Sequence, residues 1–152
     1  MKKHPSVYVV AGPNGAGKTT FALRFLPRIA TVNFVNADMI SAGLSPLKPE
    51  SAALEASRVF LRRIRELADE GVDFAFETTL AGQAYAGLLQ RMRDSGYRVH
   101  LLFLWIPSPE LALRRVADRV RKGGHNIPEQ DVRRRFSRGL RNLFSVPTLT
   151  RH

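Results

Sequence analysis

The sequence contains no cysteine and a single tryptophan among its 152 residues. Without cysteine the chain can form neither a disulfide bond nor a thiolate nucleophile, which excludes disulfide-stapled folds and cysteine-dependent catalysis. Long apolar runs are also missing. The longest, Val99 to Ile106, contains His100 and is far shorter than the roughly 20 residues that span a bilayer. We therefore expect a cytoplasmic protein without a membrane partner.

Acidic residues are scarce, since 13 aspartates and glutamates stand against 24 lysines and arginines, giving a formal net charge of +11. The basic surplus is concentrated late in the chain, in Arg114, Arg115, Arg119, Arg121, Lys122, Arg133, Arg134, Arg135, Arg138 and Arg141. Such a concentration indicates an anionic partner, which can be nucleotide phosphates, nucleic acid or an acidic protein. A solvated helical face is the alternative, but the excess of arginine favours phosphate recognition because guanidinium groups match phosphate oxygens.

The length and composition predict one compact domain over residues 1–152. Short apolar runs predict strands at residues 7–10, 33–36, 73–76 and 99–106. Helical spacing follows at residues 18–26, 50–69, 83–94, 108–122 and 128–143, and Leu54, Val59, Phe60, Ile64 and Leu67 are expected on one helix face. This alternation predicts an α/β fold with a mostly parallel sheet, in which the apolar fourth strand lies centrally.

The segment Gly12-Pro-Asn-Gly-Ala-Gly-Lys-Thr19 fits the phosphate-loop pattern of glycine, four residues, glycine, lysine and threonine. An apolar strand precedes it and a helix follows, which argues against a chance glycine-rich turn. Its backbone N–H groups and the helix N-terminus would bind phosphate oxygens, with Lys18 on the β and γ phosphates of ATP and the Thr19 hydroxyl on Mg²⁺. The expected nucleotide-binding residues are Gly12, Pro13, Asn14, Gly15, Ala16, Gly17, Lys18, Thr19 and Thr20.

Acidic and hydroxyl side chains follow two other predicted strands, at the sheet edge where the glycine loop also lies. Asp38 can deprotonate an acceptor hydroxyl, help to place Mg²⁺ or cap a helix. Glu77, Thr78 and Thr79 offer polar groups to a hydroxylated substrate or to hydrated Mg²⁺, although an ordinary strand end has the same composition. The fourth strand ends without the Walker B carboxylate of many ATPases and GTPases, which favours a small kinase over a motor or a switch protein.

Residues 112–135 are expected to form an arginine-rich lid of two basic helices around Gly123-Gly124. Phosphoryl transfer needs positive charge that closes over the γ-phosphate and excludes water, and a hinged arginine segment supplies it. Arg115 and Arg119 lie four residues apart and therefore share a helix face. His125 is a further candidate for binding substrate, although a loop histidine is more often simply solvated.

From about Tyr8 to Phe144, the chain resembles the small, chromosomal type of the zeta toxin family of phosphate-loop (P-loop) kinases. The segments that carry the resemblance are, in this order, GPNGAGKTT, VNAD, FAFETTL, RVADRV, GGHNIPE and RRRF. The resemblance implies a three-layer P-loop NTPase fold with a helical lid. It implies ATP and Mg²⁺ as cofactors, and transfer of phosphate to a hydroxyl of UDP-N-acetylglucosamine. An antitoxin protein is then a candidate partner.

The resemblance also implies roles for individual residues. Lys18 would hold the triphosphate, Asp38 would be the general base, and Glu77 and Thr79 would face the acceptor. Arginines of the helix that carries Arg115 and Arg119 would stabilise the moving phosphate.

Two departures from the family leave the acceptor open. Ala81 and Gly82 stand where toxic members commonly carry an arginine, and the chain ends at TLTRH where the family usually continues into a further strand, which we expect to be missing. One alternative is a polynucleotide 5′-hydroxyl kinase, which the charge favours although no base-stacking array is evident. Another is a non-catalytic, ATP-dependent binder of nucleic acid or protein. Arginines that converge on the glycine loop would favour catalysis, and arginines clustered elsewhere would favour nucleic acid.

Overall fold

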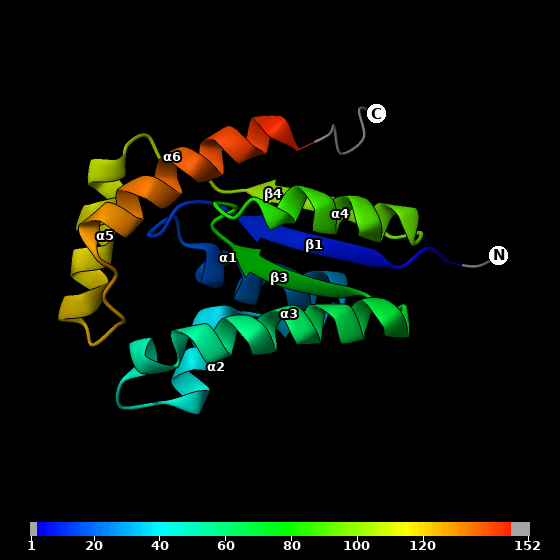
Figure 1. Cartoon of the computed structure of the whole chain (residues 1–152), viewed down its shortest axis with the longest axis horizontal. Helices are drawn as coiled ribbons and strands as arrows, with labels where there is room; N and C mark the ends of the chain where they lie inside the picture. Colours follow the sequence, from blue (N-terminus) through cyan, green and yellow to red (C-terminus); the bar gives the residue numbers. More distant parts are fainter. Residues whose placement is uncertain (1–2, 147–152) are drawn as a thin grey trace.

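The computed structural model describes residues 3–146 and places a four-stranded sheet at the centre of the molecule (Figure 1). The strands run in the spatial order β2-β3-β1-β4, and each neighbouring pair is parallel. Their bounds are β1 Ser6–Ala11, β2 Phe34–Val35, β3 Phe74–Thr78 and β4 Arg98–Phe103. The α/β fold class with a parallel sheet is therefore confirmed. The expected absence of a further C-terminal strand concerns residues after 146 and lies outside the described residues.

Helices cover both faces of the sheet and make the three layers that the family resemblance implied (Figure 1). The helices are α1 Lys18–Phe25, α2 Ala37–Leu44, α3 Ala53–Glu70, α4 Ala84–Asp94, α5 Pro109–Arg121 and α6 Glu129–Ser145, with short 3-10 turns η1 Leu26–Ile29 and η2 Pro49–Ala52. On one face, α3 and α4 pack on the side chains of Val7, Val9, Phe74 and Phe76. On the other face, α1 packs on Val10 and Ala75. No helix in residues 3–146 is long and apolar enough to cross a membrane.

The prediction that the fourth strand is central was wrong, because β4 lies at the edge of the described sheet and pairs with β1. The central positions belong to β1 and β3, whose inward side chains are fully buried, whereas Arg98 and His100 of β4 are exposed. The apolar run from Val99 to Ile106 was a misleading signal for a central strand, because its last three residues lie beyond β4. Of these, Ile106 packs instead into a separate cluster with α5 and α6.

Several helix boundaries follow from local chemistry. The Ser108 hydroxyl accepts a hydrogen bond from the Leu111 N–H at 3.2 Å and caps α5. Helix α3 ends at Gly71, whose φ of 68° is a left-handed conformation that suits glycine.

Leu54 does not join the buried face of α3 and is 69% exposed, because it lies about 200° around the helix from buried Ala56.

The lid predicted at residues 112–135 corresponds to α5, the loop after it and the start of α6, which share their own small core. Ile106, Ala112, Val116, Ile127 and Val132 pack together there, apart from the core of the sheet. Helix α6 then returns to the sheet, where the Asn142 side chain donates to the Leu80 carbonyl at 2.7 Å. Because of this return, α6 links the basic segment to the end of β3.

Candidate active site

The glycine loop joins β1 to α1 at the carboxyl edge of the sheet. Gly12 has a φ of 150°, and a side chain there would collide with the Leu104 carbonyl oxygen. Gly17 opens α1 with a φ of 84°, which turns the chain into the helix. Asn14 is 7% exposed, and its Oδ1 has no hydrogen-bond partner among the described residues. The loop therefore has the backbone conformation that a phosphate cradle needs, with positions that only glycine fits.

Lys18 is buried under this loop with 7% of its surface exposed. Its Nζ donates hydrogen bonds to the carbonyl oxygens of Gly12 at 2.8 Å and Pro13 at 2.9 Å. Burial lowers the pKa of Lys18 to about 8, against the opposing attraction of Glu77 and Asp38, and the positive charges of two arginines lower it further. Both acidic residues therefore lie within electrostatic reach of the ammonium group.

A hydrogen-bonded cluster joins the start of α1 to the ends of β2 and β3. Thr19 Oγ1 donates to Glu77 Oε2 at 2.7 Å, and Asn36 Nδ2 donates to the same carboxylate oxygen at 2.8 Å. Asn36 Nδ2 also donates to a second acceptor, Thr19 Oγ1, at 3.3 Å. Burial raises the pKa of Glu77, although the Thr19 hydrogen bond and the Lys18 charge oppose that rise.

Glu77 places a carboxylate beside the glycine loop, whereas the fourth strand ends without one. Strand β3 is the neighbour of β1 on the other side from β4, so its carboxyl end lies beside the glycine loop. The Thr19 hydroxyl and the Glu77 carboxylate are oxygen donors of the kind that Mg²⁺ prefers, and this ion keeps several waters. Within residues 3–146 no three histidine, cysteine or acidic side chains group as metal ligands.

Asp38 lies in the first turn of α2 with its side chain exposed. The structure excludes Asp38 as the cap of this helix, because Asn36 Oδ1 takes that role by accepting from the Asp38 N–H at 2.9 Å. The Asp38 carboxylate makes no hydrogen bond or ion pair to other residues in the range 3–146.

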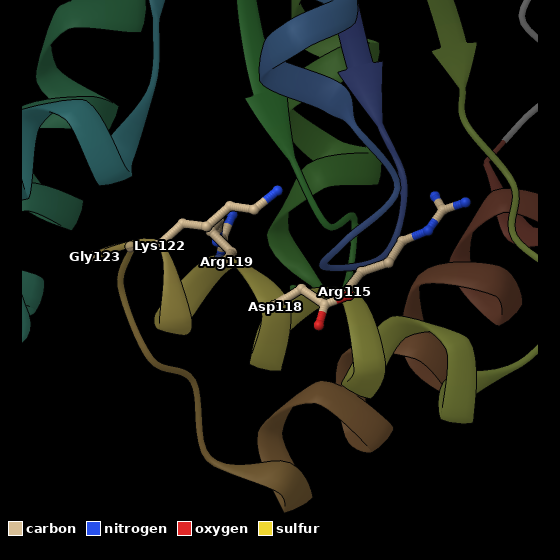
Figure 2. A pocket seen from close by; sticks show the side chains of 6 residues that line it. Arg115, Asp118, Arg119, Lys122 and Gly123 are labelled. Atoms are coloured by element: carbon tan, nitrogen blue, oxygen red, sulfur yellow. The ribbon is translucent and has the colours of Figure 1, made fainter.

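Two arginines of α5 diverge from each other although they share a face of the helix. Arg115 Nη1 donates to the Gly15 carbonyl at 3.1 Å, on one side of the loop, while Arg119 and Lys122 point to the other side (Figure 2). The charge of Arg119 acts on both Lys18 and Glu77. A pocket of about 460 Å³ lies along this helix, lined by Arg115, Asp118, Arg119, Lys122, Gly123 and Gly124.

Arg135 is a further site candidate, which in the sequence is only one member of the basic run. It is half-buried on α6, and its charge also lowers the pKa of Lys18. Helical spacing from buried Val132 and Gly139 could have identified it, because Arg135 lies on the same inward face. Its neighbours differ, since Arg133 pairs with Glu110 and Glu129 at the surface. Some side chains of the basic run thus face the site, and others lie in solvent at the surface.

The remaining predicted substrate residues lie in other surroundings. Thr78 is buried and its hydroxyl accepts from the Leu80 N–H at 2.9 Å. Thr79 is half-buried, with its carbonyl oxygen packed against Gly139 of α6. His125 Nδ1 lies 3.6 Å from Glu50 Oε2, so the loop after α5 reaches the segment between α2 and α3. Roles for these side chains in substrate binding stay predictions.

Comparison with known proteins gives a family and a fold. Residues 7–142 match the model of a family described as an AAA domain. A protein of Haemophilus influenzae, described as uncharacterised, is 30% identical over 125 residues, which cover 82% of this chain and 88% of that protein. Its description adds no activity.

Solved structures of low sequence identity share this fold. A chain of the AvrRxo1-ORF1:ORF2 complex with ATP has a TM-score of 0.79 at 18% identity, covering 95% of this chain and 50% of that one. The protein thus spans about half the length of that relative. The shikimate kinase of Acinetobacter baumannii, in complex with shikimate, has a TM-score of 0.61 at 20% identity, covering 95% and 81%.

Two further structures bear on the predicted alternatives. A chain of the PezAT chromosomal toxin–antitoxin system of Streptococcus pneumoniae has a TM-score of 0.63 at 17% identity, covering 80% of this chain and 55% of that one. A chain of the Pnkp1/Rnl/Hen1 RNA repair complex has a TM-score of 0.71 at 16% identity, covering 99% and 51%. At such identities the likeness shows the fold alone, an α/β fold that the chain shares with P-loop kinases.

Proposed function

Because the chain belongs to the AAA domain family and has the fold of P-loop kinases, we propose that it transfers the γ-phosphate of ATP to a hydroxyl group of a small molecule. The observation that carries this proposal is the convergence of chemically distinct groups on the glycine loop. Lys18 lies beneath the loop, Thr19 and Glu77 are hydrogen-bonded beside it, and the charges of Asp38 and Arg119 act on Lys18. An exposed carboxylate without a hydrogen-bond or ion-pair partner among the described residues, such as that of Asp38, can act as a general base, which favours a kinase over a motor or switch protein.

Each of these groups has a role in the proposed transfer. The loop N–H groups and Lys18 bind the phosphates. Asp38 accepts the proton of the acceptor hydroxyl while the hydroxyl oxygen bonds to the γ-phosphorus. The bond from the γ-phosphorus to the bridging oxygen breaks, and ADP leaves. Mg²⁺ held near Thr19 and Glu77 would neutralise phosphate charge. Arg119 and Arg135 stabilise the charge on the phosphoryl group while the α5–α6 segment excludes water.

UDP-N-acetylglucosamine is the acceptor that the zeta toxin resemblance favours, and the likeness to a chain of the PezAT system supports testing it first. Ala81 and Gly82 lack the arginine that toxic members commonly carry, so other hydroxylated acceptors belong in the same test. An antitoxin-like protein partner is proposed on the same grounds.

A polynucleotide 5′-hydroxyl kinase is the second candidate, supported by the net charge of +11 and by the likeness to a chain of an RNA repair complex. Base stacking would need exposed aromatic rings near the loop. The rings of Phe74, Phe76, Phe60 and Tyr97 pack on one another in the core. Among the described aromatic residues, the exposed ones are Trp105 at 62% and Phe144 at 82%, and they lie on separate elements, after β4 and on α6, so they form no stacking array. We therefore favour the small-molecule acceptor.

The test is incubation of the purified protein with ATP, Mg²⁺ and separate acceptors, with products read by mass spectrometry. The panel contains UDP-N-acetylglucosamine, other nucleotide sugars, small polyols and an oligonucleotide with a 5′-hydroxyl. A phosphorylated small molecule supports the proposal, and labelling of the oligonucleotide alone supports the second candidate. Failure to bind ATP would refute both.

A further inference from the structure

Asn36 lies at the meeting point of β2, α2, β3 and the start of α1, and its side chain is 5% exposed. Both ends of its amide are used. Oδ1 accepts hydrogen bonds from the N–H groups of Asp38 at 2.9 Å and Met39 at 3.1 Å. Nδ2 donates to Glu77 Oε2 at 2.8 Å and reaches Thr19 Oγ1 at 3.3 Å. One buried amide therefore contacts the Glu77 carboxylate, the Thr19 hydroxyl and the backbone of Asp38, three residues that the proposed transfer uses.

The two ends of the amide serve separable purposes. Capping requires only an acceptor, and serine, aspartate and asparagine cap helices about equally well. Donation to a carboxylate requires the amide N–H, which serine cannot supply at that distance and aspartate lacks altogether. An asparagine used only as a cap would be replaceable by serine, whereas an asparagine that orients Glu77 would not.

We propose that Asn36 is a positioning residue for phosphoryl transfer, which holds Glu77 and Thr19 in place for the nucleotide and its metal while fixing the backbone of Asp38. This inference rests on the proposed kinase function. Asn36 acts through its neighbours and needs no contact with the reacting atoms. Groups that orient metal ligands in this way commonly change metal affinity or activity by about 10- to 100-fold when they are removed.

The experiment compares Asn36→Ser, which keeps the cap and removes the donor, with Asn36→Ala, which removes both. The probe is a non-hydrolysable ATP analogue, and calorimetry measures its dissociation constant in Mg²⁺ and in EDTA. The ratio of the two constants reports the metal contribution without requiring turnover. Asn33→Ser is the matched control, because Asn33 precedes the same strand and donates to the Asp73 carbonyl at an exposed site.

We expect the factor by which Mg²⁺ tightens binding of the analogue to be about tenfold or more smaller in Asn36→Ser than in the wild type. The thermal midpoint of Asn36→Ser should stay close to that of the wild type. Asn36→Ala is expected to lose both the tightening and stability. Asn33→Ser should keep the wild-type ratio.

A double-mutant cycle tests whether Asn36 acts through Glu77. If it does, Asn36→Ser has little further effect on the ratio in a Glu77→Gln background, because the oriented carboxylate is already gone. Additive losses would contradict this coupling.

Two results would overturn the inference and are distinguishable from failure of the proposed function. If the wild type binds the analogue with Mg²⁺ and Asn36→Ser binds it with the same ratio, Asn36 is only a helix cap and the kinase proposal stands. If the wild type does not bind the analogue at all, the kinase proposal fails, and the role of Asn36 falls with it.

Discussion

Replacing Lys18 by methionine should change how the stability of the protein depends on pH. Lys18 is 7% exposed, and burial lowers its pKa from 10.5 to about 8 in the folded protein. The unfolded chain therefore binds this proton more tightly than the folded chain does. At about 1.4 kcal/mol for each pH unit, the buried charge costs the folded state about 3 kcal/mol below pH 8.

The sign of the effect follows from the proton balance. Below pH 8 both states carry the proton, so the cost is constant. Between pH 8 and 10.5 the folded state has lost the proton that the unfolded state still binds, so wild-type stability rises with pH. Lys18→Met has no such proton. The difference in unfolding free energy between the two proteins should therefore shift by about 2 to 3 kcal/mol in favour of the wild type from pH 7 to pH 10.

Urea unfolding followed by circular dichroism at intervals from pH 7 to pH 10 measures this difference. The methionine variant also loses two hydrogen bonds to loop carbonyls, but that loss adds an offset and leaves the pH slope unaffected. Lys48→Met, which removes an exposed lysine, controls for the loss of one positive charge. Parallel stability curves for the wild type and Lys18→Met would refute the argument that the loop buries a charge.

Three further predictions concern the site and its loop. Asp38→Asn should lower turnover by about 10² to 10⁴ with little change in ATP affinity, because the amide cannot accept the proton; a collapse of ATP binding in calorimetry would assign Asp38 to the metal or to structure. Arg119→Ala should lower kcat by about 10² or more, and by more than Arg115→Ala, since the Arg115 guanidinium points to the other side of the loop; equal losses in steady-state kinetics would contradict this assignment. Gly12→Ala should destabilise the fold by about 1 to 3 kcal/mol in urea unfolding, because its methyl group meets the Leu104 carbonyl, whereas Gly43→Ala, where the space is open, should not.

The amino-acid sequence alone determined the features that depend on neighbouring residues. The glycine loop, the Ser108 cap and the glycine stop after α3 were all predictable, because each requires a particular residue type within a few positions. The layer order was also predictable, since strands that alternate with helices form a parallel sheet covered on both faces. Asp38 and Glu77 were site candidates because both lie at or just after the carboxyl ends of strands, which meet at one edge of a parallel sheet.

The tertiary structure alone decided which of these groups meet and what they do there. Sheet order depends on how distant crossovers pack, so an apolar run could not reveal that β4 lies at the edge of the described sheet or that Glu77 lies beside Thr19. The basic run looked uniform in sequence, and only the packing of α6 placed Arg135 inward while Arg133 pairs with acids at the surface. Asn36 gave no signal beyond a good helix cap, because its second role depends on a carboxylate that only folding brings within 2.8 Å.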